Sequence, residues 1–559
     1  MQEISFFALG GMGENGKNFY LLKIQSSYFV LDAGLKYPSL IMNGIDAIIP
    51  YYSKLEFIKD KIKGIFITSS LDTHSGALSY VIEYLNVPVY AANFTIEVLK
   101  HYLKQKNIDD NKVIFQVVHD QTQIKLDDIK IHFFSISHFL PGVFGIAFET
   151  VKGIILYMSA MNLLQSKNKS FQTNFKYLAE LSQKKVLALL PASQGVLNIT
   201  TLKKEDILEY DLSSYFASIE KNIIISFLIP DLLKIQMVID LAVEANLKIV
   251  ILGRKSEKII DIALQQKYLR IPDNFLVNLK KASDYLKYQN LVVIVVGKRF
   301  EPFYRLQRMC KQTDRLMRLN KLDKILLFSI DFAGIDKIQN KTIDMLARNG
   351  FMVDVLVKDL LQTFSYNYED NFRLMLNLLN PTFIIPVMGE YRHQYQVKKI
   401  AQNFNYPVNK IFLLENGDIW SYDGKNKPLI KKKFFKNLGD ILIDGTPVLD
   451  GNDFILKDRE LLANDGIIIV VCNLDMRLRK IIGNIELISK GFLSKIKIDS
   501  LLMEIKDLFV EISKNFLNNN RQIKWSDFKN NLREELSKFV FKETKKKPVI
   551  IPVLISVIR

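Results

Sequence analysis

Cationic side chains at helical spacing give residues 302–320 the clearest binding chemistry in the sequence. Five of them follow one another at steps of three, three, four and three residues, which places them on one face of a helix. Such a basic stripe is typical of a surface that binds nucleic acid through its phosphates, and the alternative is a solvated helix face. These residues are Arg305, Arg308, Lys311, Arg315 and Arg318, with Lys298 and Arg299 directly before the helix.

The overall charge also favours a polyanionic partner. The chain has 76 Lys and Arg against 59 Asp and Glu, a formal net charge of +17. The alternative source of this charge is the base composition of an AT-rich genome, because Lys, Asn, Ile, Leu and Phe are abundant while Gly and Pro number only 25 and 15. Apolar residues make up 48% and charged residues 24%, which excludes a wholly disordered chain.

Cysteine usage and hydropathy place the chain in a reducing, aqueous setting. Two cysteines, Cys310 and Cys472, are too few for a disulfide framework or a cysteine zinc site. The apolar runs 466–474 and 549–558 are too short to span a bilayer, and the start of the chain lacks the basic segment of a signal peptide. We therefore expect a cytoplasmic protein with no membrane partner.

The pattern of strands and helices predicts an α/β protein of about three or four domains. Short β-rich runs alternate with helical segments in the first 204 residues, and the stretch 113–158 indicates a run of antiparallel strands. From 205 to 360 strands and helices alternate regularly, which predicts a doubly wound domain with a parallel sheet. Residues 361–428 return to the first style, 429–449 read as a linker, and 450–559 read as a small α+β domain.

Four segments, in order along nearly the whole chain, carry a family resemblance. They are FFALGGMGENGKN (6–18), VLDAGLKYP (30–38), LNLLNPTFIIPVMGEYR (376–392) and LKDRELLANDGIIIVV (456–471). These segments resemble the corresponding stretches of the ribonuclease J family. That resemblance implies a metallo-β-lactamase αββα sandwich formed by residues 1–204 and 361–428, with an inserted β-CASP domain at 205–360 and a C-terminal assembly domain at 450–559.

The resemblance breaks at the positions that hold metal in the family, which uses two zinc or manganese ions. Such a centre needs about seven His and Asp ligands converging on one cleft. Two ligand positions keep histidine, His74 and His138, and both are read as core histidines or vestigial ligands. We expect no bound cofactor and no catalytic residues. The replaced ligand positions carry Ser69, Leu71, Thr73, Ala160 and Met388, and Ala192 stands where the family has an acidic residue near the β-CASP domain.

Asp72 lies one position from the lost aspartate, and we interpret it as the N-cap of the next helix. Asp32 is retained where the resemblance implies a supporting role outside the metal shell.

Some of the RNA-binding positions that the resemblance implies also carry different residues. The phosphate-binding loop of the family, His-x-Ser-Gly-His, has lost both histidines, while Arg254 matches the family's Gly-Arg-Ser position. The polar and basic end of a β-CASP strand has become apolar. The loop positions are Gln362, Ser365 and Tyr366, and the strand-end positions are Ile229, Pro230, Leu232 and Leu233.

These observations predict a ribonuclease J-like protein of RNA processing and decay without catalytic activity. It would act as an RNA-binding or structural partner of an active ribonuclease J paralogue, because the resemblance implies homo-oligomers and mixed complexes of paralogues. One alternative is an active 5′–3′ exo- and endoribonuclease with a rebuilt metal site. Another is an RNA-binding module without a ribonuclease partner.

Overall fold

The computed structural model divides the chain into two compact units. One comprises Met1–Tyr37 and Ala47–Ile441, and the other Pro38–Asp46 and Leu442–Arg559. The described residues are 3–38, 42, 44–163, 166–197, 205–217, 221–253, 256–281, 283–288, 290–328, 335–356, 368–436, 438–445, 448–450, 454–475, 477–492, 495–519 and 524–557.

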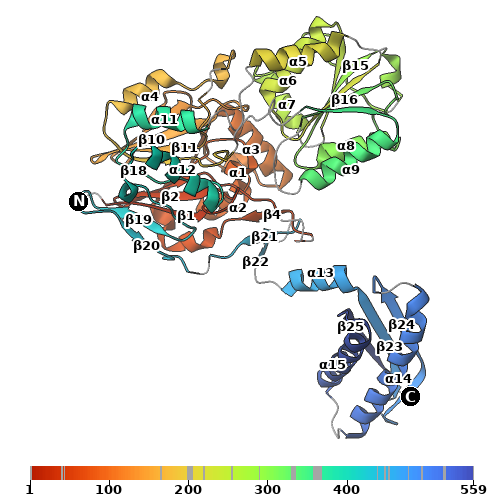
Figure 1. The fold of residues 1–559 in the computed structure, drawn as a ribbon. Coiled ribbons are helices and arrows are strands. Elements are labelled where there is room, and N and C mark those ends of the chain that lie inside the picture. Colours follow the sequence, from red (N-terminus) through yellow and green to blue (C-terminus); the bar gives the residue numbers. More distant parts are fainter. Residues whose placement is uncertain are drawn as a thin grey trace. The chain divides into compact units, whose positions relative to one another are not determined.

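Two sheets form a sandwich in the first unit, with helices flanking both (Figure 1). The eight-stranded sheet runs, in spatial order, β20 (Leu429–Lys431), β19 (Ile419–Tyr422), β1 (Ile4–Gly10), β2 (Phe19–Ile24), β3 (Ser27–Leu31), β5 (Ile62–Phe66), β6 (Val89–Ala91) and β7 (Phe115–Val117). The six-stranded sheet runs β18 (Phe383–Ile384), β12 (Val186–Pro191), β11 (Gly153–Met158), β10 (Phe144–Thr150), β9 (Ile129–Ser135) and β8 (Gln123–Leu126). The helices are α1 (Asp72–Ser75), α2 (Leu78–Leu85), α3 (Asn93–Gln105), α4 (Phe175–Ser182), α11 (Tyr368–Leu379) and α12 (Tyr391–Asn403).

Aromatic side chains pack between the two sheets. Phe29 of β3 lies 5.2 Å, centroid to centroid, from Phe148 of β10, and Phe66 of β5 lies 6.1 Å from Phe133 of β9. All four are essentially inaccessible to solvent. Large buried rings contribute strongly to core stability, so this layer holds the sandwich together.

The sequence predicted that the strands between 113 and 158 form one antiparallel run, but one of these strands lies in the other sheet. β8 to β11 are antiparallel neighbours in the six-stranded sheet. β7 instead pairs in parallel with β6 at the edge of the other sheet. The chain reaches β7 through helix α3, and a helical crossover brings the next strand back parallel.

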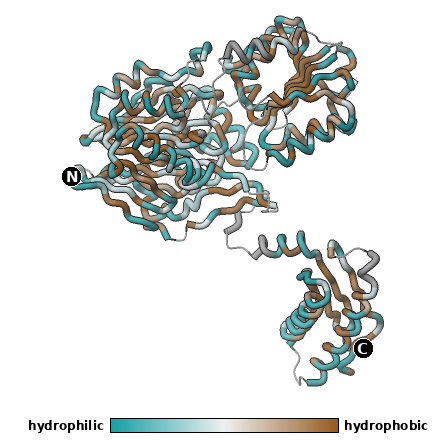
Figure 2. The backbone as a smooth tube through the Cα atoms, viewed as in Figure 1, coloured by the Kyte–Doolittle hydropathy of each residue, from teal (hydrophilic) through white to brown (hydrophobic). Residues whose placement is uncertain are grey.

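The inserted domain has the doubly wound architecture that the sequence predicted. Its five strands are all parallel and run, in spatial order, β14 (Lys248–Leu252), β15 (Leu291–Val296), β13 (Ile223–Phe227), β16 (Lys324–Phe328) and β17 (Met352–Leu356). Figure 2 shows these apolar strands in brown between more hydrophilic helical segments. The helices are α5 (Glu205–Ala217), α6 (Leu232–Glu244), α7 (Glu257–Gln265), α8 (Glu301–Cys310) and α9 (Ile335–Arg348).

Both faces of this parallel sheet are buried, because successive strand residues point to opposite sides. Ile223 and Ile225 belong to a large core that also contains Ile235 of α6 and extends into the sandwich. Ile224, one position along, belongs to a separate core with Phe303 of α8.

The segment 429–449, expected to be a linker, contains regular structure. It starts with β20, which pairs with β19 at the edge of the eight-stranded sheet. Three further short strands are β4 (Ala47–Ile49), β21 (Ile441–Ile443) and β22 (Val448–Asp450). The linker prediction is therefore corrected in its first residues, which form sheet.

The C-terminal part of the second unit is the small mixed domain that the sequence predicted. Its core combines Ile468 and Val470 of the central strand with Phe528 and Leu532 of the last helix. In the described part of the chain, no helix is long and apolar enough to cross a membrane. The sheet runs β24 (Lys480–Lys490), β23 (Ile467–Asp475) and β25 (Val549–Val557), and the helices are α13 (Phe454–Asp465), α14 (Lys495–Asn519) and α15 (Trp525–Thr544).

Candidate functional site

The loop that follows β5 carries three of the replaced ligand positions, and their side chains make local contacts. The hydroxyl of Ser69 accepts a hydrogen bond from the backbone N–H of Leu71 at 3.3 Å. Leu71 packs against the large core of the sandwich. The hydroxyl of Thr73 lies 3.0 Å from Nδ1 of His74. None of these three side chains is the imidazole or carboxylate that a zinc or manganese ion needs.

His74 lies against a fully buried carboxylate. Its Nε2 is 4.0 Å from Oδ2 of Asp32. The Asp32 carboxylate accepts a hydrogen bond from the Thr68 backbone N–H at 2.8 Å, through Oδ1, and another from the Tyr157 hydroxyl at 2.6 Å, through Oδ2. Burial raises the pKa of the Asp32 carboxyl and lowers the pKa of His74. Asp32 is therefore held by protein donors.

His138 is the second retained histidine, and it follows β9. Its Nδ1 accepts a hydrogen bond from the Leu140 backbone at 3.1 Å, which leaves the neutral ring protonated at Nε2. Burial, and to a lesser degree the neighbouring His74, lowers the pKa of His138 to about 3. The structure thus brings the two retained histidines together, both neutral at physiological pH.

Met388 fills its ligand position with an apolar side chain in the core. Its backbone is left-handed, with φ of 61°, and its carbonyl accepts a hydrogen bond from Ser193. Ala160 packs against the same core, and Ala192 is buried. These three positions supply no side-chain metal donor.

A series of contacts between protein groups connects the retained and the replaced ligand positions. It runs from His74 through Asp32 to the hydroxyl of Tyr157, whose ring lies 5.9 Å from the ring of Tyr20. The Tyr20 hydroxyl accepts a hydrogen bond from the backbone N–H of Met388 at 3.1 Å. Within the described ranges, no group of three or more His, Cys, Asp and Glu side chains could hold a metal ion. The side chains at these positions therefore do not fit the two-metal centre that the resemblance implies.

The N-cap interpretation of Asp72 is wrong. Asp72 is the first residue of α1, and no side chain caps that helix. Its carboxylate instead accepts hydrogen bonds from Lys298 Nζ at 2.7 and 2.8 Å and from the Tyr37 hydroxyl. Lys298, predicted to bind RNA, therefore already has an internal partner.

The predicted basic helix is also corrected, because α8 ends at Cys310. Arg305 and Arg308 both approach Asp314, a buried carboxylate in the following loop, at 3.5 and 3.6 Å. Arg299 lies over the ring of Tyr37, 4.7 Å from its centroid. The five cations thus do not share one helical face. Those that are exposed are Arg308, Lys311, Arg315 and Arg318.

The apolar strand end after β13 packs against the loop of His138. The backbone N–H of Leu232 donates to the carbonyl of Phe139 at 3.2 Å, and Pro230 and Leu232 are buried. Ile229 and Leu233 pack against the large core. Four predicted binding positions lie outside the described residues, namely Arg254, Gln362, Ser365 and Tyr366.

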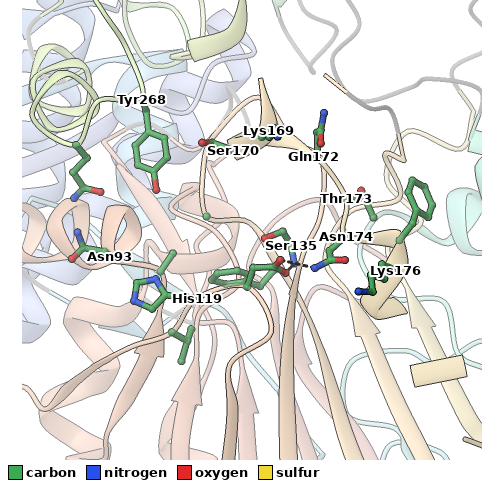
Figure 3. Close-up of a pocket in the computed structure, with 17 residues that line it drawn as sticks. Asn93, His119, Ser135, Lys169, Ser170, Gln172, Thr173, Asn174, Lys176 and Tyr268 are labelled. Atoms are coloured by element: carbon green, nitrogen blue, oxygen red, sulfur yellow. Dashed lines mark hydrogen bonds between the residues drawn. The ribbon is translucent and has the colours of Figure 1, made fainter. Parts of the chain in front are cut away.

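A polar pocket of about 820 Å³ lies between the sandwich and the end of α7, and the sequence analysis missed it. Figure 3 shows Asn93, His119 and Tyr268 on one side and Gln172, Asn174 and Lys176 on the other. Asp120 accepts hydrogen bonds from the Ser135 backbone at 2.8 Å and the Asn174 side chain at 2.6 Å. The polar run from Lys169 to Lys176 was the available signal, but nothing in it indicated which distant residues face it.

The sandwich, the inserted parallel domain and the altered ligand loops together define a metallo-β-lactamase fold with a β-CASP insertion. Residues 220–346 match the family described as "Ribonuclease J, beta-CASP domain", and residues 454–557 match "Ribonuclease J C-terminal domain". The chain is 33% identical to "Ribonuclease J 2" of Staphylococcus aureus (strain NCTC 8325 / PS 47), covering 99% of this chain and 98% of that protein. It belongs to the ribonuclease J family.

Two further comparisons agree with this fold. The "Ribonuclease J 2" of Staphylococcus epidermidis is 32% identical over the same share of both chains. A crystal structure of a protein of unknown function from Enterococcus faecalis V583 matches 75% of this chain and all of its own, with a TM-score of 0.52 and 11% identity. That last likeness concerns the fold alone.

Proposed function

We propose that this protein is a catalytically inactive member of the ribonuclease J family that acts in RNA processing and decay as an RNA-binding or structural partner of an active paralogue. The observation that carries the proposal is the side-chain set at the ligand positions. Ser69, Leu71 and Thr73 make local contacts, and Ala160 and Met388 offer no donor. Because a two-metal hydrolase depends on its ligands to generate hydroxide, this set removes the chemistry.

Metal content and nuclease activity test the inactive state directly. The full chain, purified without chelator, should contain far less than one equivalent of zinc or manganese. It should leave a 5′-monophosphorylated single-stranded RNA intact under conditions in which an active family member degrades it. Stoichiometric metal together with exonuclease activity would overturn the proposal.

A rebuilt metal site is the second candidate, and the neighbouring pair His74 and His138 favours it. Two imidazoles would remain as ligands, and carboxylates from elsewhere in the chain would have to complete the site. In that case His74→Ala should abolish both metal binding and RNA cleavage. An unchanged cleavage rate in this variant would remove the candidate.

The binding part of the proposal is supported by the exposed cations that follow α8 and by the match of residues 454–557 to a ribonuclease J C-terminal domain. Affinity purification of the full chain should bring down a ribonuclease J paralogue, and mass analysis would separate this mixed complex from a homo-oligomer. If neither a paralogue nor RNA binds, the partner role fails.

A further inference from the structure

The inserted domain meets the sandwich at loops that follow its parallel strands. Lys298 lies just after β15 and binds Asp72, the first residue of α1. Leu232 lies just after β13, and its N–H donates to the carbonyl of Phe139 next to His138. In open α/β sheets the carboxyl ends of the strands are where ligands enter. In this protein, the residues after two of these strands instead contact the segments of the sandwich that carry the family's metal-ligand positions.

The contact around Lys298 is built from charge and aromatic faces. The Lys298 ammonium donates to both carboxylate oxygens of Asp72 and, at 2.6 Å, to the Tyr102 hydroxyl. It also lies 4.5 Å from the centroid of the Tyr102 ring. Tyr37 donates to Asp72 and is covered by Arg299. We call these five residues the Asp72 clasp.

The clasp is largely shielded from water. The side chains of Lys298 and Asp72 are 23% and 14% exposed. Burial alone would lower the pKa of Lys298, yet the Asp72 carboxylate and the two tyrosines raise it, so the ammonium stays charged. Removing one partner of such a pair leaves a poorly solvated charge without compensation. The pair therefore opposes separation of the two domains.

We propose that the Asp72 clasp is an autoinhibitory contact that holds the inserted domain against the ligand-position loops of the sandwich and so keeps RNA from reaching them. An RNA phosphate would have to displace the Asp72 carboxylate from Lys298, and that same carboxylate repels it. The sequence alone suggested the opposite role, with Lys298 as an RNA ligand. The two roles predict opposite signs in one experiment.

Hydrogen exchange on the full chain measures whether the clasp holds the domains together. In Lys298→Met, the amides of residues 231–233, at the second contact, should exchange roughly tenfold faster or more. Amides inside β13 and β15 should keep their wild-type rates. Lys287→Met is the matched control, because it removes an ion pair with Asp284 inside the inserted domain. Unchanged exchange at 231–233 in Lys298→Met would overturn the clasp.

A double variant separates the clasp from the simple penalty of an unpaired charge. Asp72→Asn/Lys298→Met has no unpaired charge and also lacks the clasp, so the faster exchange at 231–233 should persist. A return to the wild-type rate would show that charge burial caused the single-variant effect, and the clasp would fail. Tyr102→Phe, which removes one hydrogen bond, is a milder variant and should shift exchange in the same direction if Lys298→Met does not fold.

RNA affinity tests autoinhibition, and this arm rests on the RNA-binding part of the proposed function. A closed state that excludes RNA weakens the apparent affinity by the fraction of open molecules. Lys298→Met should therefore bind a single-stranded RNA roughly threefold to tenfold more tightly than the wild type. An affinity that falls or stays constant would overturn autoinhibition. Metal content and nuclease assays are independent of this variant, so failure of the proposed function remains distinguishable.

Discussion

The backbone N–H of Met388 donates to the hydroxyl of Tyr20 at 3.1 Å, and the same hydroxyl donates to the carbonyl of Gly11 at 3.1 Å. One buried phenol therefore satisfies two backbone groups beside a position that carries a metal ligand in the family. These two hydrogen bonds tie the loop of Met388 to the loop of Gly11.

Tyr20→Phe tests this role. The variant leaves the Met388 N–H and the Gly11 carbonyl without their partner in a buried environment, so we expect a loss of about 1–3 kcal/mol in the free energy of unfolding. Urea denaturation followed by fluorescence measures the loss. Tyr304→Phe, at an exposed position, is the control and should stay within about 0.5 kcal/mol of the wild type. Equal stability of the two variants would contradict the prediction.

Asp314→Ala should destabilise the inserted domain. Asp314 is buried, lies 3.5 Å from the largely buried Arg305, and accepts hydrogen bonds from the backbone of Leu316 and Met317. Removing it leaves Arg305 without a partner, at a cost of about 3 kcal/mol. Thermal unfolding measures the effect.

Asp344→Ala provides the comparison for Asp314→Ala. Its pair with Arg348 is well exposed, and exposed pairs contribute about 0–1 kcal/mol. A similar drop in melting temperature for both substitutions would show that the burial of Asp314 is unimportant.

The thiol of Cys472 should make the C-terminal domain sensitive to alkaline pH. Burial raises the pKa of Cys472 from 9.0 to about 11, so the folded state keeps its proton longer than the unfolded state. The stabilisation is complete below about pH 9 and is lost as pH rises toward 11, with a total of about 3 kcal/mol. Unfolding free energies measured from pH 8 to 11 should fall along this range. Cys472→Val should flatten the profile, and an unchanged slope would rule out this thiol.

The exposed cations in the last turn of α8 and in the loop that follows it should contribute to RNA affinity without forming a helical stripe. Arg308→Glu and Arg315→Glu should each weaken binding of single-stranded RNA. Each should also reduce the slope of log K against log salt by about 0.7 if one phosphate contact is lost. Fluorescence anisotropy over a salt series measures both quantities. If neither charge reversal changes the affinity or the slope, these residues are a solvated surface.

The elements that sequence patterns predicted best are the buried parallel strands. Runs such as Ile223–Phe227 and Leu291–Val296 are rich in β-branched residues and buried on both faces. Their local sequence is therefore sufficient to predict a strand. The pairing of β7 was missed because it depends on which sheet edge is free after a crossover, and no local pattern reports that.

The end of α8 was missed for a similar reason. Cationic spacing continues past Cys310 to Arg318 without a Gly or Pro to mark a stop. The helix ends where Asp314 draws two arginines inward and accepts backbone N–H groups of the following loop. A side chain that acts on residues up to nine positions away leaves no signature in a helical pattern.

The clasp shows the same limit at long range. Asp72 and Lys298 are 226 residues apart in sequence. The sequence patterns favoured a helix N-cap at Asp72 and an RNA-binding cation at Lys298, so neither pattern indicated that the two residues form a pair. Short motifs suggested which positions correspond to the family's metal ligands, whereas the contacts of those positions required the three-dimensional structure.

The apolar interior that begins between the two sandwich sheets continues without interruption to one face of the inserted domain. The sandwich and the inserted domain should therefore unfold cooperatively. Deleting residues 205–356 should expose apolar surface of the sandwich, and the inserted domain should not fold independently. A substitution that disturbs this shared core should therefore destabilise both bodies together.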